Sequence, residues 1–151
     1  MTKSQQIYPT DLNDTKWLKS RPYLPAETKT GRPRKHGWRK ILNGIFYLLQ
    51  SGCSWRMLPR ELPAWKTVYH YFRLWQRDGT WERLNRLLRE KVRRALGKKR
   101  QASAAILDSQ SSKTSEGGTE CGFDAGKKVT GRKRHTLVDT LGLVSKVVVT
   151  A

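Results

Sequence analysis

The chain has 151 residues and a formal net charge of +19, most of it in residues 1–100, where 24 Lys and Arg stand against 7 Asp and Glu. Such an excess attracts polyanions, so we expect residues 1–100 to bind nucleic acid rather than to serve only as a solubility surface. Two isolated cysteines exclude a disulfide framework, and the absence of a signal peptide or a long apolar run predicts a cytoplasmic protein.

The first predicted helix ends near Pro22 and Pro25 and is followed by a basic linker over residues 29–36. Within this linker, Gly31-Arg32-Pro33 is similar to the core of minor-groove hooks, in which an extended Arg enters a narrow groove. The alternative is a solvated linker whose cations touch phosphates incidentally. The residues of the linker that we expect at DNA are Arg32, Arg34 and Lys35.

The clearest predicted helix spans residues 38–50 and ends at Gly52. Its apolar residues share one stripe at i, i+3, i+4 and i+7: Leu42, Ile45, Phe46 and Leu49. The next predicted helix spans residues 64–78 and has three apolar residues on one face: Val68, Phe72 and Trp75. A further helix is expected over residues 81–96, with basic residues, Arg93 among them, on the faces away from its leucines.

A helix, a Gly-containing turn and a second, basic helix form a helix-turn-helix-like pattern, although the turn is longer than usual. We expect the helix over residues 64–78 to read a DNA groove. Its candidate DNA-binding residues lie off the apolar face: Lys66, Arg73 and Arg77. All six tryptophans fall in this half of the chain, and we expect most of them in a small helical core.

The pattern changes after residue 97. We expect a helical DNA-binding domain over residues 1–97, a basic linker over 98–103 and a second domain over 104–151. In the second domain, the sequence predicts a buried strand over 104–107, an exposed loop over 111–128, and strands over 134–139 and 143–149.

Asp108 directly follows the apolar run of the first predicted strand. A buried strand that ends in one carboxylate can deliver that acid to the surface of a sheet, where it can hold a metal ion. The alternative is an Asp at a strand end that caps the next turn.

Several blocks of this sequence together resemble bacterial insertion-element transposases. The blocks similar to their N-terminal helical domain are Gly52-Cys53-Ser54-Trp55-Arg56-Met57-Leu58-Pro59, Trp65-Lys66-Thr67-Val68-Tyr69 and Trp75-Gln76-Arg77-Asp78-Gly79-Thr80-Trp81. Asp108-Ser109-Gln110-Ser111-Ser112-Lys113 resembles the start of their DDE catalytic core, and blocks over 126–128, 131–135 and 138–143 resemble its second strand. The resemblance implies an α+β protein: an all-α, helix-turn-helix-like bundle, then the first three antiparallel strands of an incomplete ribonuclease H-like core.

Members of this family use two Asp and one Glu to hold two divalent metal ions for in-line displacement at phosphorus. The resemblance implies that Asp108 is the first of these carboxylates and that Mg²⁺ or Mn²⁺ serves the complete enzyme. The other two are expected beyond the matching blocks, so we expect this chain alone to be catalytically incomplete. We reject Asp139 as a substitute because it adjoins a predicted turn, and we expect Glu116 and Asp124 to be solvated.

One basic cluster stands in the second half: Lys127, Lys128, Arg132, Lys133 and Arg134. These cations either clamp phosphates beside the scissile bond or protect a solvated hairpin edge from aggregation.

The expected function is that of the N-terminal portion of a transposase that binds the terminal repeats of an insertion element. The expected partners are double-stranded DNA, a chain from a downstream reading frame that supplies the remaining carboxylates, and a second copy of this chain. One alternative is a stand-alone DNA-binding repressor or competitor of the full transposase, and another is a basic RNA-binding protein.

Overall fold

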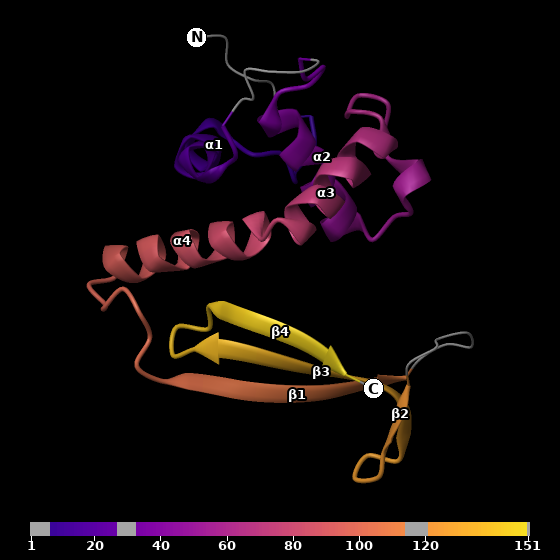
Figure 1. The fold of residues 1–151 in the computed structure, drawn as a ribbon, viewed down its shortest axis with the longest axis vertical. Coiled ribbons are helices and arrows are strands. Elements are labelled where there is room, and N and C mark those ends of the chain that lie inside the picture. The colour runs from indigo at the N-terminus through magenta and orange to yellow at the C-terminus, as the bar shows by residue number, and fades with distance from the viewer. Residues whose placement is uncertain (1–6, 27–32, 114–120, 151) are drawn as a thin grey trace. The chain divides into compact units, whose positions relative to one another are not determined.

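The computed structural model describes residues 7–26, 33–113 and 121–150. Within these ranges the chain forms four α-helices followed by an antiparallel sheet of four strands, which confirms the predicted α+β class (Figure 1). The chain packs as two compact units, residues 1–87 and 88–151. Helix α4, Thr80–Ala95, contributes residues to both units.

The first unit begins with α1, Asp14–Ser20, and the short 3-10 helix η1, Arg21–Tyr23. Asn13 caps α1, because its side-chain oxygen accepts a hydrogen bond from a backbone N–H of the first turn at 2.8 Å. Helix α2 spans Trp38–Ser51 and ends as predicted at Gly52, whose φ of 66° is the left-handed conformation that a C-cap favours.

The 3-10 helix η2, Trp55–Met57, leads to α3, Trp65–Arg77. Gly79 separates α3 from α4, because its φ of 70° is a left-handed conformation that ends the helix. The carboxylate of Asp78 then accepts the backbone N–H of Thr80 at 2.9 Å, which satisfies a donor at the start of α4. The predicted break between these two helices is therefore present.

Helices α2 and α3 supply the core of the first unit, with Ile41, Ile45, Val68 and Trp75 inaccessible to solvent. Most of the other tryptophans pack against this core, as predicted from the sequence. The stripe predicted for α2 is wrong at its last position, because Leu49 is exposed. The core takes Ile41 instead, one turn before Ile45.

The second unit contains a sheet in which β3 is central. Its strands are β1, Ala105–Lys113, β2, Gly122–Asp124, β3, Val129–Asp139, and β4, Val144–Thr150. β1 pairs with most of β3, whereas β2 and β4 pair with different parts of it. The predicted three strands are present, but β1 and β3 are longer than predicted and β2 was missed.

The predicted loop over residues 111–128 is therefore wrong at the end of β1 and at β2, and its residues 114–120 lie outside the described ranges. The polar residues Ser111, Ser112 and Lys113 extend β1 because each of them pairs with a residue of β3. The last pair is Lys113 with Gly131. Gly131 is required where β3 pairs with the end of β1, since a Cβ there would overlap the backbone oxygen of Ser112.

The sheet is less buried than predicted. Ile106 and Leu107, in the strand predicted as buried, are 58% and 66% exposed, and the valines of β4 are also exposed. No described segment covers these side chains. In the described ranges, no helix combines the length and apolar character needed to cross a bilayer.

Candidate functional site

Helix α3 has one buried face and one basic face. Val68 and Trp75 on the buried face are inaccessible to solvent. The opposite face carries Lys66, His70, Arg73 and Arg77, which are all exposed and follow the helical spacing i, i+4, i+7 and i+11. The sequence of α3 contains no Asp or Glu, so no carboxylate of this helix offsets their charge. The three cations predicted at DNA are thus aligned on one surface.

A shallow groove runs along the same surface of α3. It is lined by Tyr69, His70, Arg73, Leu74 and Arg77. Arg73 and Arg77 therefore belong to a mixed polar and aromatic surface rather than to a purely cationic one, and Lys66 does not line the groove. Sequence reasoning missed His70 and Tyr69, although their spacing from Lys66 and Arg73 places them on the predicted face.

The basic linker before α2 is partly packed. The guanidinium of Arg34 lies over the ring of Trp38, 3.5 Å from its centroid, in cation–π geometry. Lys35 is exposed. Arg32, the candidate for minor-groove insertion, lies outside the described residues. Packing of Arg34 on the first residue of α2 ties the end of this linker to the helical unit.

Asp108 lies in the middle of β1, exposed and opposite Thr136 of β3. The strand therefore presents this carboxylate at the surface of a sheet, as the sequence predicted. Throughout residues 7–26, 33–113 and 121–150, no three His, Cys, Asp or Glu side chains gather closely enough to hold a metal ion. Asp108 thus stands as a single candidate ligand.

Asp139 lies on the other face of the same sheet. It pairs with Ala105, which is three positions from Asp108 along β1. Successive strand residues point to alternate faces, so the side chains of the two acids lie on opposite faces. Asp139 is buried at 1% exposure. These two carboxylates are not placed to share one metal ion, in agreement with the rejection of Asp139 from sequence.

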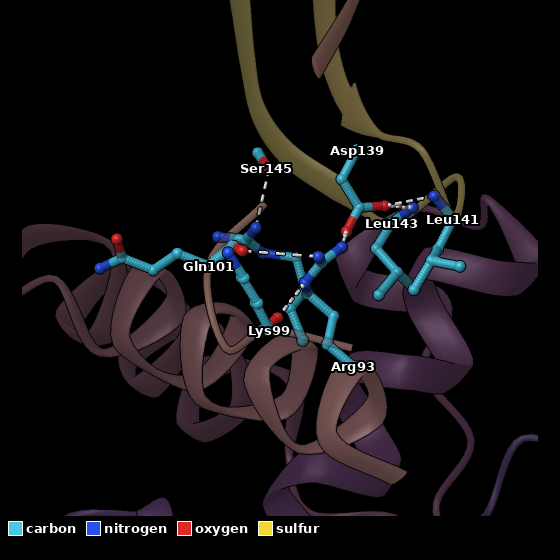
Figure 2. A network of polar contacts seen from close by, with 8 residues as sticks. Arg93, Lys99, Gln101, Asp139, Leu141, Leu143 and Ser145 are labelled. Carbon is cyan, nitrogen blue, oxygen red and sulfur yellow. Dashed lines mark hydrogen bonds and ion pairs between the residues drawn. The ribbon is translucent and has the colours of Figure 1, made fainter. Parts of the chain in front are cut away.

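A polar network surrounds Asp139 (Figure 2). Its Oδ2 accepts a hydrogen bond from Arg93 Nη1 at 2.6 Å, and its Oδ1 accepts the backbone N–H groups of Leu141 and Leu143 at 2.9 and 3.0 Å. Burial raises the pKa of Asp139, but these hydrogen bonds and the positive charge of Arg93 outweigh it and hold the pKa below its ordinary value. The ionised carboxylate of Asp139 therefore holds Arg93 and the turn that carries Leu141 and Leu143 in place.

Arg93, predicted on a face of its helix away from the leucines, is buried, with the residue 6% exposed. Besides Asp139, its Nε donates to the backbone carbonyl of Lys99 at 2.8 Å, in the linker that follows α4 (Figure 2). On the same helix, Arg89 donates to Ser145 Oγ at 2.7 Å. The partner of Arg93 lies 46 residues away, so no periodicity within the helix could have indicated its burial.

The basic cluster predicted in the second half is divided by strand geometry. Lys127 and Lys128 lie in the turn between β2 and β3, whereas Arg132, Lys133 and Arg134 lie within β3. Consecutive strand residues alternate, so Lys133 faces away from Arg132 and Arg134. The cluster is therefore two surfaces rather than one.

Lys133 belongs to a small polar group with Asp124 and Ser111. Its Nζ lies 3.3 Å from Asp124, and Ser111 Oγ donates to the same carboxylate at 2.6 Å. The bond from Ser111, with a backbone N–H of the turn and the nearby ammonium group, lowers the pKa of Asp124 to about 2. The prediction of a merely solvated Asp124 is wrong, because this carboxylate organises the hairpin.

Comparison with known proteins identifies relatives of the helical part. Residues 12–85 match the protein family described as "Putative transposase of IS4/5 family". The chain is 36% identical over 91 residues to "Insertion element IS402 uncharacterized 16.2 kDa protein" of Burkholderia cepacia, a match covering 56% of this chain and 61% of that protein. It is 29% identical over 68 residues to "Uncharacterized protein y4sN" of Sinorhizobium fredii (strain NBRC 101917 / NGR234), covering 45% and 54% respectively. The chain thus spans less than two thirds of either relative, and no solved structure matches it.

Proposed function

We propose that this chain, whose residues 12–85 match the family described as "Putative transposase of IS4/5 family", is part of an insertion-element transposase and binds the ends of the element during DNA transposition. The observation that carries the proposal is the exposed basic face of α3. Its cations lie on one side of a helix whose other side is fixed in the core. A helix held in this way can enter the major groove of duplex DNA as a rigid body.

The charges of this face suit a duplex. Arg73 and Arg77 are one turn apart, and each provides a planar guanidinium that can bind a phosphate or the major-groove edge of guanine in bidentate geometry. Arg73 also donates to Gln76 at 3.1 Å, which orients its guanidinium on the helix surface. We therefore assign base reading and phosphate contact to α3, within a helix-turn-helix-like arrangement of α2 and α3.

Fluorescence anisotropy with labelled element-end duplex tests this assignment. The Arg73→Ala/Arg77→Ala double variant is expected to weaken binding by at least about tenfold, since each lost bidentate contact is worth roughly 1–3 kcal/mol. Lys146→Ala in β4 is the control, because it removes an exposed cation that belongs to the second unit rather than to α3. Equal affinities for the double variant and the wild type would refute DNA binding by α3.

The proposal extends to the sheet, which we interpret as the beginning of a ribonuclease H-like core with Asp108 as its first acid. A two-metal centre for Mg²⁺ or Mn²⁺ requires several oxygen ligands. Among the described residues, Asp108 has no two His, Cys, Asp or Glu companions close enough to complete such a centre, so these residues do not by themselves fit it. We derive no chemical step at a metal ion from this chain, and we assign to Asp108 the role of one ligand in a site completed by other residues.

The isolation of Asp108 among the described residues favours a second candidate function, in which the chain acts as a DNA-binding repressor or competitor of the full transposase. In this function it occupies element ends without cleaving them. A nicking assay in Mg²⁺ or Mn²⁺ distinguishes the two candidates. Binding without nicking supports the competitor, whereas nicking that is abolished by Asp108→Ala supports catalysis by the chain itself.

A further inference from the structure

Phe123 is an aromatic side chain on the surface of the second unit. It is 66% exposed in β2, whereas the other two phenylalanines pack against the core of the helical unit. β2 is three residues long and pairs with the beginning of β3, and this hairpin bends away from the plane of the other strands (Figure 1). An aromatic ring at such a position offers a flat apolar surface to a ligand.

The same hairpin carries exposed cations. The turn that follows β2 carries Lys127 and Lys128, both exposed. Lys128 has a φ of 50°, a left-handed conformation that favours Gly or Asn. The carboxylate of Asp124 accepts two backbone N–H groups of the turn, at 3.1 and 3.2 Å, and so fixes the turn that presents these lysines. The hairpin therefore holds a lysine where local geometry prefers a glycine.

By strand register, Phe123 and Asp108 belong to the same side of β3. Phe123 pairs with Thr130, and Asp108 pairs with Thr136 on the same strand. These two threonines are six positions apart on β3, and an even offset places all four side chains on one face of the strand ladder. The distance from Thr130 to Thr136 along the strand is about 20 Å.

Two arginines occupy the interval between Phe123 and Asp108. Arg132 and Arg134 alternate with Thr130 and Thr136 on the same face of β3. Arg134 also donates to Gln110 of β1 at 2.6 Å, which holds its guanidinium against the sheet. The acidic group of this hairpin, Asp124, lies on the opposite face, where Lys133 neutralises it. The surface thus runs from an aromatic ring through cations to one carboxylate.

We infer that this surface binds an unpaired DNA strand, with one base stacked on Phe123 and the backbone phosphates on the cations of the hairpin and of β3. Single strands are recognised by this combination, because every base has a face for stacking and every nucleotide carries a phosphate. The inference rests on the proposed function and deepens it: α3 binds the duplex of the element end, and the hairpin binds a strand that is separated from its complement.

The test measures the affinity of the full chain for labelled oligothymidylate, for the same oligonucleotide with abasic sugars, and for duplex. Phe123→Ala is expected to weaken binding to oligothymidylate about tenfold, the loss typical of one stacked base. Phe123→Tyr keeps the ring and is expected to keep the affinity. Leu18→Ala, which shortens an exposed apolar side chain in α1, is the control.

The abasic oligonucleotide separates stacking from other effects of the substitution. The wild type is expected to bind it about tenfold more weakly than oligothymidylate, whereas Phe123→Ala is expected to bind both equally, because the ring and the base act as one pair. Lys128→Gly relieves the left-handed residue and removes a cation. This variant is expected to keep the hairpin folded and still to weaken binding to oligothymidylate. Lys146→Ala, the control, is expected to leave that binding unchanged.

Three results would overturn the inference: unchanged affinity of Phe123→Ala for oligothymidylate, equal affinity of the wild type for normal and abasic strands, or an equal loss of duplex affinity in Phe123→Ala. If the proposed function is wrong, a different result is expected: the affinity for duplex does not change in the α3 double variant. The two failures are therefore read in separate arms of the same experiment.

Discussion

Asp108 and Asp139 lie on opposite faces of one sheet, although the strands that carry them are paired. Asp108 is exposed on the surface that continues into the basic hairpin, whereas Asp139 is buried against Arg93. The two acids consequently have different roles. Asp108 is available to a ligand, and Asp139 joins the last turns of α4 to the sheet within the second unit.

The first prediction concerns Asp139. Asp139→Asn leaves the charge of Arg93 buried without its counter-ion, so we expect the unfolding midpoint at neutral pH to fall by at least about 5 °C. Circular dichroism during heating measures this change. Arg100→Met is the control, because its ion pair with Glu90 is largely exposed on the arginine side and contributes little. Equal midpoints for Asp139→Asn and the wild type would contradict the anchoring role.

The same ion pair predicts a pH dependence. The pKa of Asp139 is lower in the folded chain than its ordinary value, so the unfolded state binds more protons. Its contribution to stability is therefore complete above the ordinary carboxyl pKa, about 3.9, and is lost as the pH falls through the lower folded-state value. We expect the difference in unfolding midpoint between the wild type and Asp139→Asn to shrink as the pH falls below about 4 and to vanish below the folded-state pKa. A difference that persists unchanged into stronger acid would contradict this assignment.

The third prediction is a steric effect at Gly131, where β3 pairs with the end of β1. A Cβ there would meet the backbone of Ser112, which cannot move without breaking the β1–β3 pairing. We expect Gly131→Ala to reduce the free energy of unfolding by about 3 kcal/mol, measured with urea. Gly126→Ala is the matched control, because its added Cβ would lie 3.4 Å from a side-chain oxygen. Comparable stabilities of the two variants would show that the backbone of Ser112 in β1 does not approach Gly131 closely enough to exclude a Cβ.

A fourth prediction concerns the packing of α2 on α3. A Cβ at Gly44 would lie 2.9 Å from Val68 Cγ2, so Gly44→Ala is expected to cost about 1–3 kcal/mol of stability through overpacking. Val68→Ala removes the obstructing methyl groups. Urea unfolding of the single and double variants should show a smaller cost of Gly44→Ala in the Val68→Ala background. Additive costs would mean that the two residues are not in contact.

The helical half could be predicted well because its determinants are local. The apolar spacing of Val68, Phe72 and Trp75 fixes the buried face of α3 and thereby identifies the face that carries Arg73 and Arg77. Likewise, Gly52 marks the end of α2 because the left-handed cap depends on one residue.

The sheet was predicted less well because its determinants are non-local. Ser111, Ser112 and Lys113 have no apolar alternation, and they are strand residues only because β3 pairs with them. The burial of Arg93 depends in the same way on Asp139, far away in sequence. Asp108 was placed on its strand from sequence, but the exposure of that strand depends on what covers the sheet, which no local pattern encodes.

The salt dependence of duplex binding tests the central claim most directly. For a protein that neutralises phosphates, the logarithm of the binding constant falls linearly with the logarithm of the salt concentration, with a slope of about −0.9 per phosphate contact. We predict that Arg73→Ala/Arg77→Ala makes this slope for element-end duplex shallower by about one unit or more, whereas Lys146→Ala leaves it unchanged. An unchanged slope in the α3 double variant would contradict the proposal that this helix holds the DNA.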